Sequence, residues 1–191
     1  MLSLTEVRTG LRQQESSKAS QPVAALIALE PQAWNDLFEG YFRKMYNFAY
    51  VRTGDVHLSE EIAAEVFAAA ARGIARYRDT GAPIGAWLYR IARNITADYV
   101  DRRARRPVVS LDAVQLETDG MALGVENAAD LARCVARLTP EQQEVIALRF
   151  FNDCSLQEAA AALGKSVGAV KLLQHRALAA LRRHLDPEAP R

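Results

Sequence analysis

The sequence has few of the residues that build metal centres, disulfide scaffolds or membrane spans. Its 191 residues include two cysteines and three histidines. Cys134 and Cys154 lack the CxxC spacing of a zinc or redox site, and so sparse a pair is typical of a reduced, cytoplasmic protein. No run of about 18 apolar residues and no signal-peptide core is present. We therefore expect no metal, no other cofactor and no membrane insertion.

The residue sets of common catalytic sites are missing as well. The sequence shows no paired carboxylates, no nucleophile with a matching base and no glycine-rich phosphate loop. An all-helical enzyme is therefore disfavoured. A protein that acts by binding, and not by catalysis, is the better expectation.

Charge is unevenly distributed along the chain, although the net charge is only +1. Residues 76–106 contain eight arginines against three aspartates, and residues 164–184 contain five Lys and Arg and no acid. Between these blocks, residues 107–131 hold five acids and no Lys or Arg. Two basic blocks that flank an acidic one indicate two surfaces for an anionic partner.

Hydrophobic periodicity predicts an all-α fold of two small helical domains joined by an extended acidic linker. Apolar residues recur at helical spacing from about residue 31 to Thr53-Gly54, then from Ser59, which we expect to cap a second helix, and again over 84–103. The polar N-terminus and the aperiodic stretch after Pro107 predict disorder and a linker. The expected division is an extension over 1–22, a first domain over 23–106, a linker over 107–127 and a second domain over 128–186.

The stretch "SLQEAAAALGKSVGAVKLLQHRALAALRRHL" predicts a helix-turn-helix within the second domain. Ser155 and Glu158 form a capping box, Gly164 permits the positive φ of a sharp turn, and Ser166 caps the next helix. The N-terminal end of that second helix would enter the major groove of DNA, with cations on both sides to contact phosphates. The alternative is an ordinary helical hairpin with a solvated basic face.

The basic helix of the first domain interleaves aromatics with cations. Trp87 and Tyr89 stand beside Arg90, Arg93 and Asn94, and flat rings among cations suit the stacking of unpaired bases. The alternative is that Trp87 and Tyr89 are core residues at the end of a helix.

These segments resemble bacterial sigma factors of the extracytoplasmic-function type, the minimal members of the sigma-70 family. The resemblance spans residues from about 30 to 185. "SEEIAAEVFAAAARGIARY" resembles the helix that binds core RNA polymerase, and "AWLYRIARNITADYVDRRARR" the helix that melts and reads the minus-ten element. "LTPEQQEVIALRFFNDCSLQEAAAALGKSVGAVKLLQHRALAALRRHL" resembles the domain that reads the minus-thirty-five element.

The resemblance implies roles for individual residues. Core polymerase would be bound by Glu61, Glu65 and Phe67. The melted minus-ten strand and its upstream backbone would meet Trp87, Arg90, Asn94, Asp98, Arg102 and Arg103. The minus-thirty-five duplex would meet Lys165, Ser166, Val167, Gly168, Lys171, His175 and Arg176. The chain departs from the family pattern at Ala64, where glutamine is frequent, and at Leu172 and Leu173, where polar or basic residues are frequent, which leaves the promoter sequence open.

The resemblance also implies partners. These are core RNA polymerase and promoter DNA, both as duplex and as melted single strand, and family members are often held inactive by an anti-sigma factor. The alternative is a stand-alone helix-turn-helix regulator that binds duplex DNA as a dimer. Such a regulator would bind without polymerase and would have no use for the aromatic-basic helix.

Overall fold

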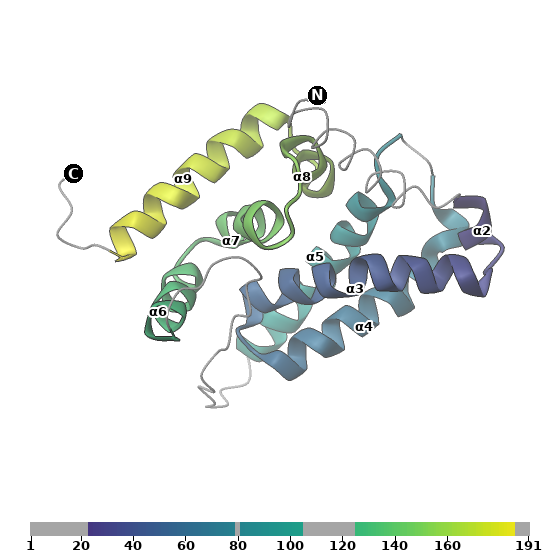
Figure 1. Cartoon of the computed structure of the whole chain (residues 1–191), viewed down its shortest axis with the longest axis horizontal. Coiled ribbons are helices and arrows are strands. Elements are labelled where there is room, and N and C mark those ends of the chain that lie inside the picture. Colours follow the sequence, from purple (N-terminus) through teal and green to yellow (C-terminus); the bar gives the residue numbers. More distant parts are fainter. Residues whose placement is uncertain (1–22, 79–80, 105–124, 186–191) are drawn as a thin grey trace, which may run out of the picture.

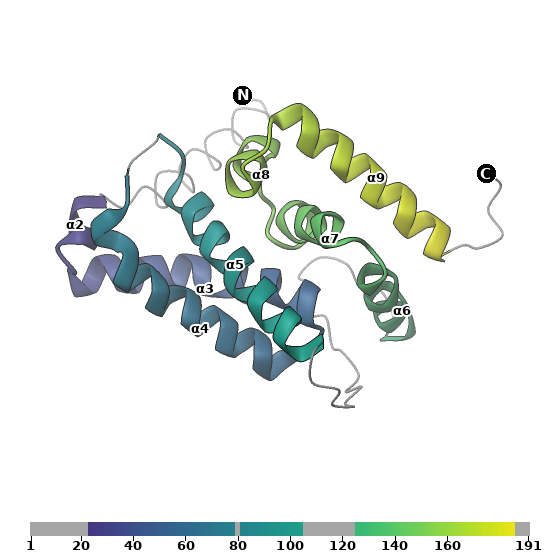
Figure 2. The same cartoon turned by 180° about the vertical axis from the view of Figure 1, so that it is seen from behind.

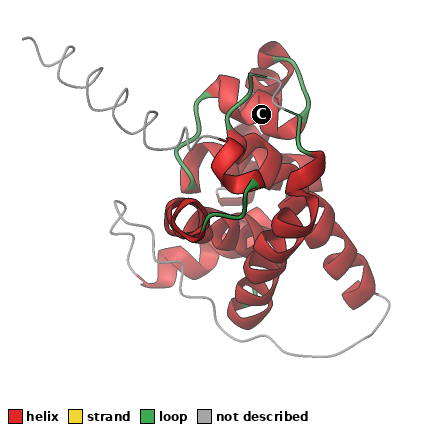
Figure 3. Ribbon diagram, turned by 90° about the vertical axis from the view of Figure 1, so that its right-hand side faces the viewer, coloured by secondary structure: helices red, strands yellow, loops and turns green. Residues whose placement is uncertain are grey.

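The computed structural model describes residues 23–78, 81–104 and 125–185, and all regular structure within these ranges is helical (Figure 3). The predicted all-α fold is therefore confirmed. The first part of the chain forms α2 (Val23–Ile27), α3 (Pro31–Thr53), α4 (Val56–Gly73), a 3-10 turn (Ile74–Arg76) and α5 (Ile84–Ala104). The second part forms α6 (Val125–Ala136), α7 (Pro140–Ile146), a π-helical turn (Ala147–Phe151), α8 (Leu156–Leu163) and α9 (Val167–Leu185). No helix of the described ranges is long and apolar enough to cross a membrane.

Helices α3, α4 and α5 pack together as the core of the first part (Figure 1). Their fully buried side chains recur at the helical spacing that the sequence predicts, as in Leu37, Met45 and Phe48 of α3 and Ile62 and Val66 of α4. Helix α3 ends at Gly54, which has a left-handed φ of 64°. Glycine takes this conformation without the steric penalty that a Cβ brings, which explains the break after Thr53.

The start of α4 differs from expectation. Asp55, not Ser59, is the N-cap, because the Asp55 carboxylate accepts a hydrogen bond from the Leu58 amide at 3.0 Å. Ser59 lies fully buried in the first turns, where its hydroxyl donates to the Asp55 carbonyl at 2.6 Å. Asp55 starts the helix four residues before Ser59, so Ser59 falls inside α4 and cannot cap it.

Loss of the Asp55 cap is expected to weaken the first bundle. Asp55→Ala should lower the free energy of unfolding by about 1 kcal/mol, whereas Asp55→Asn, which can still cap, should lose less. The Leu58 amide is the main cause that lowers the pKa of Asp55. A lowered pKa means that this stabilisation is present above the unfolded pKa and is lost as pH falls through the folded one. Urea denaturation of the three proteins between pH 7 and pH 3 tests this, and equal losses in the two variants would contradict it.

The second part contains the predicted helix-turn-helix. Ser155 with Glu158 at α8, and Thr139 with Gln142 at α7, both form capping boxes. Gly164 has a φ of 64° in the turn, and Val170 of α9 is fully buried. Between α7 and α8, the wider turn Ala147–Phe151 closes with a bond from the Asn152 amide to the Ala147 carbonyl, one residue further apart than in an α-helix.

The two parts of the chain lie against each other and share one continuous hydrophobic core. Helices α7 and α8 lie between α9 and the first bundle in opposite views (Figures 1 and 2). Helix α9 is therefore on the side that faces away from α3, α4 and α5. The expected linker over 107–127 falls mostly outside the described residues, apart from the start of α6 at Val125.

Candidate nucleic-acid interface

One side of α9 is exposed and carries cations without acids. The predicted contacts Val167, Gly168, Lys171, His175 and Arg176 are all exposed, and so is Ser166 just before the helix. Val170 and Ala177 are buried on the opposite side. The Ser166 hydroxyl accepts a hydrogen bond from the Ala169 amide at 3.2 Å, so the predicted cap is present. The structure thus brings these six residues together at the outward N-terminal half of the helix.

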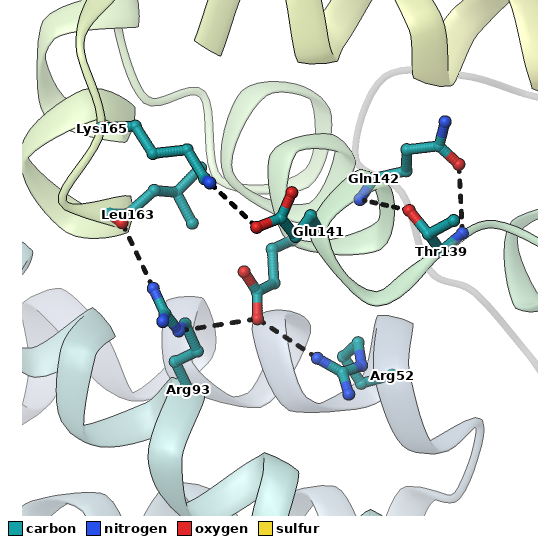
Figure 4. A network of polar contacts seen from close by, with 8 residues as sticks. Arg52, Arg93, Thr139, Glu141, Gln142, Leu163 and Lys165 are labelled. Atoms are coloured by element: carbon teal, nitrogen blue, oxygen red, sulfur yellow. Dashed lines mark hydrogen bonds and ion pairs between the residues drawn. The ribbon is translucent and has the colours of Figure 1, made fainter. Parts of the chain in front are cut away.

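Lys165 belongs to the turn and is directed toward α7 (Figure 4). Its ammonium is 2.9 Å from a carboxylate oxygen of Glu141, and its side chain is only 31% exposed. An exposed pair of this kind is worth little free energy, so it holds Lys165 weakly. Lys165 therefore lies at the rim of the α9 surface rather than within it.

The aromatics of α5 separate into two roles. Tyr89 is 4% exposed and packs on Phe48 with ring centroids 5.7 Å apart, so it is a core residue. Trp87 is half-buried and meets Tyr77 edge-on, with centroids 5.1 Å apart. Residues two apart on a helix cannot share a face, which is why only one of these rings reaches the core fully.

The other predicted minus-ten residues lie along the outer side of α5. Asn94 and Asp98 are exposed. The Arg102 guanidinium lies 4.9 Å from the centre of the Tyr99 ring, and Arg103 pairs with Asp55 at 3.0 Å.

Two arginines of α5 contact the second part of the chain. Arg90 donates to the Ala161 carbonyl at 3.2 Å, and Arg93 donates to the Leu163 carbonyl at 3.2 Å (Figure 4 shows Arg93). Both carbonyls belong to the last turn of α8. Nothing in the sequence pattern pointed to these contacts, because their acceptors are backbone atoms.

The position of α5 depends on Tyr41, which the sequence analysis did not single out. A Cβ on Gly85 would lie 2.5 Å from the Tyr41 ring, so only glycine allows the first turn of α5 to approach α3 this closely. Burial raises the pKa of Tyr41 to about 12. The ring therefore stays neutral and acts as a fixed spacer beneath the basic helix.

The residues predicted to bind polymerase lie on α4. Glu61 accepts a hydrogen bond from the Tyr99 hydroxyl at 3.0 Å, and Glu65 pairs with Arg72 at 2.6 Å. Phe67 is 8% exposed and lies under Phe38 of α3, with centroids 4.9 Å apart. Phe38 itself is 44% exposed, so it presents the aromatic surface that the sequence analysis assigned to Phe67.

No group of three or more His, Cys, Asp or Glu side chains within the described ranges is arranged to hold a metal ion. Both cysteines are free and buried. Burial is the main cause that raises the pKa of the Cys154 thiol, which disfavours the reactive thiolate. The exposed sides of α4, α5 and α9 therefore carry cations, aromatic rings and acidic side chains that can contact partners.

Comparison with known families agrees with this arrangement. Residues 37–106 match sigma-70 region 2, and residues 134–183 match region 4 of the same family. The first match covers most of α3 and all of α4 and α5, and the second covers the helix-turn-helix. The polar and aromatic residues described above fall within these two regions.

Individual relatives span nearly the whole chain. The chain is 36% identical to the ECF RNA polymerase sigma factor BldN of Streptomyces coelicolor, over 92% of this chain and 69% of that protein. It is 31% identical to SigW of Bacillus subtilis, over 82% of this chain and 90% of SigW. Among solved structures, CnrH in complex with the cytosolic domain of CnrY has a TM-score of 0.64 and 28% identity, over 90% of this chain and 99% of CnrH. The chain therefore belongs to the sigma-70 family, as an extracytoplasmic-function RNA polymerase sigma factor that serves transcription initiation.

Proposed function

We propose that this sigma factor acts without catalysis by holding two DNA-contacting surfaces at a fixed separation on core RNA polymerase. The exposed, acid-free side of α9 would contact the minus-thirty-five duplex, and the outer side of α5 would contact the melted minus-ten strand. The observation that carries this proposal is the α9 surface, where Lys171, His175 and Arg176 are exposed together on a helix that contains no acid. The site of action would be the cytoplasm, where polymerase and promoters are found.

The two surfaces would contribute different free energies. A good bidentate contact with a base edge in the major groove gives ~1–3 kcal/mol of discrimination. Stacking of a flipped base on an aromatic ring gives ~1–3 kcal/mol, which offsets part of the few kcal/mol that unpairing costs. Neither term alone gives tight promoter binding. Holding both on one enzyme makes the second contact intramolecular, which raises its effective concentration.

Polymerase would be bound by the exposed side of α3 and α4. Glu61 and Glu65 lie on α4, and Phe38 of α3 exposes an aromatic ring over Phe67. Acidic side chains suit a basic partner surface, and an exposed aromatic ring suits an apolar pocket. CnrH was solved with the cytosolic domain of CnrY, and we infer that this chain likewise binds a protein partner, which the family resemblance predicts to be an anti-sigma factor.

Transcription in vitro tests the proposal. Core polymerase with the purified chain should start transcripts from a promoter library, and the selected promoters should share two elements at a fixed spacing. Core polymerase without the chain is the control. A chain that binds duplex DNA as a dimer and leaves core polymerase unchanged would instead be the stand-alone regulator.

The role of Trp87 is tested by its substitution. Trp87→Ala should slow strand opening by roughly tenfold, since one stacking contact of ~1–3 kcal/mol is lost, and should leave duplex affinity largely unchanged. Trp87→Phe keeps a stacking ring and should retain most of the rate. Fluorescence of a base analogue in the minus-ten element measures opening, and filter binding measures affinity. An equal loss of both in Trp87→Ala would mean that the ring serves only its packing on Tyr77.

A further inference from the structure

One exposed leucine lies at the middle of the α9 surface that would contact the minus-thirty-five duplex. Leu172 is 50% exposed, although Val170, two residues earlier, is fully buried. Successive residues of an α-helix are about 100° apart around its axis, so Leu172 projects almost directly away from the core. Leu173, by contrast, packs against the core. Of the two leucines that depart from the family pattern, Leu172 is thus the one that a bound duplex would meet.

The neighbours of Leu172 are polar, cationic or small. Residues three and four positions apart share one side of a helix, which places Gly168, His175 and Arg176 beside Leu172. Lys171 is exposed on the adjoining side, and α9 contains no acid. A single exposed leucine is ordinary on a protein surface, but this one lies among cations that suit phosphates. A duplex held by those cations would bring base edges over Leu172.

Gly168 leaves room for such an approach. It is the second residue of α9, one turn before Leu172. A Cβ at this position would meet no atom within 4 Å, and the φ of Gly168 is not left-handed. Neither the packing nor the backbone of the chain therefore requires glycine here, and alanine would favour the helix. A partner that comes close to the first turn from outside does give glycine a reason.

We propose that Leu172 recognises a thymine of the minus-thirty-five element by packing on its C5-methyl group, and that Gly168 lets the duplex come close enough for this contact. In the major groove thymine is the one base that presents a methyl group, and an apolar side chain can distinguish it. Leucine offers no hydrogen bond to a base edge, so the base pair over Leu172 should be T·A in either orientation. This inference rests on the proposed function, since it takes the α9 surface as the duplex contact.

Deoxyuridine tests the contact, because it differs from thymidine only in lacking the methyl group. The template is a promoter selected in the transcription experiment, with each thymine of its minus-thirty-five element replaced in turn by deoxyuridine. The element lies upstream of the transcript, so the RNA product is unchanged. Single-round transcription with limiting holoenzyme, formed from core polymerase and the full-length chain, compares the initiation rates.

We expect deoxyuridine at the position over Leu172 to lower the initiation rate about fourfold. This factor corresponds to about 0.8 kcal/mol, the value for one buried methylene group. Leu172→Ala should be insensitive to the substitution at that position, and circular dichroism should show an unchanged fold, since alanine favours a helix. The matched control is Leu185→Ala, which removes a leucine that is 52% exposed at the far end of the same helix. This control should keep the fourfold effect.

Gly168→Ala tests the close approach. The added Cβ should hold the duplex away from α9, so the variant should initiate more slowly and lose most of the deoxyuridine effect. Its resistance to urea should be equal to or higher than that of the wild-type chain, because alanine is the better helix former. A full deoxyuridine effect in Gly168→Ala would overturn the role of this glycine.

Three results would overturn the contact at Leu172. These are a selected minus-thirty-five element without a T·A pair, a wild-type chain that is indifferent to deoxyuridine, and a deoxyuridine effect that is undiminished in Leu172→Ala. The thymine-containing template keeps the two proposals apart. If the wild-type chain initiates in dependence on the minus-thirty-five element but ignores the methyl group, only the leucine contact fails. If initiation is absent or indifferent to that element, the proposed function fails.

Discussion

Charge reversal on the exposed side of α9 is expected to abolish initiation that depends on the minus-thirty-five element. Lys171→Glu with Arg176→Glu should lower the initiation rate by roughly 100-fold or more, because two contacts of ~1–3 kcal/mol each are replaced by repulsion from phosphates. Core binding should persist, since α9 packs mainly on α6, α7 and α8 and not on the α4 helix expected to bind polymerase. Single-round transcription measures the first effect, and competition with a labelled sigma factor for core polymerase measures the second.

The same helix offers a matched control. Arg182 and Arg183 are exposed near its C-terminal end, about 17 Å along the axis from Lys171 at a rise of about 1.5 Å per residue. Arg182→Glu with Arg183→Glu changes the net charge equally, but at a place where only DNA backbone could be reached. Its effect should be less than about tenfold and independent of the minus-thirty-five sequence. Equal losses in the two double variants would show that net charge, and not the placement of the α9 surface, drives binding.

Loss of Arg52 is expected to give the largest effect on stability. Arg52→Met leaves Glu144 buried without its nearest cation, which should cost about 3 kcal/mol at neutral pH. The variant destabilises the contact between the two parts of the chain, because Glu144 is buried only while they are packed together. The loss of stability therefore cannot exceed the free energy that holds the two parts together. Urea denaturation followed by circular dichroism should then show the second part separating or unfolding first.

The pH dependence of that variant gives a sharper test. Burial is the main cause that raises the pKa of Glu144 in the wild-type chain, with Arg93 and Arg52 opposing it. Removing Arg52 should raise the pKa further. A raised pKa in the folded state means that the penalty is present above that pKa and is relieved as pH falls through it. Much of the loss in Arg52→Met should therefore be recovered as pH falls through the raised pKa of Glu144.

A double substitution is the control for this prediction. Arg52→Met with Glu144→Leu replaces the buried pair by apolar side chains, which is often neutral or stabilising. The double variant should be more stable than Arg52→Met alone at pH 7 and should lack its pH dependence. A double variant as unstable as the single one would mean that Arg52 acts through packing rather than through its charge.

Local features of the fold were predictable from the sequence because local chemistry determines them. The capping boxes at Thr139 and Ser155 and the left-handed Gly164 are formed by residues within four positions of one another. Such signals survive without knowledge of the rest of the chain. Ser59 shows the limit of this approach, since a serine followed by acids suits a cap equally well whether or not Asp55 has already started the helix.

The packing of one part of the chain on the other could not be predicted. Arg90 and Arg93 donate to backbone carbonyls about 70 residues away, and a carbonyl has the same chemistry at every position. Glu144 follows two glutamines in α7, a pattern typical of an exposed acid, and its burial depends on the partner surface of α3. The pattern of α4 likewise does not indicate that Phe38 of α3 packs over Phe67. Sequence patterns report which side of a helix is buried, but not which other helix buries it.

The π-helical turn Ala147–Phe151 determines how the helix-turn-helix is aimed. In an α-helix each residue turns the chain by about 100°. The π-helical turn holds one residue more than an α-helical turn, so deleting that residue would rotate the side chains that follow by about 100° around the helix axis. The Phe151 carbonyl would then no longer face Asn47, and the side-chain amide of Asn152 would no longer face the Lys44 carbonyl. The number of residues in this turn thus determines the orientation of α8 and α9 relative to α7. A one-residue deletion there would change the direction of α9 without altering any residue of α9 itself.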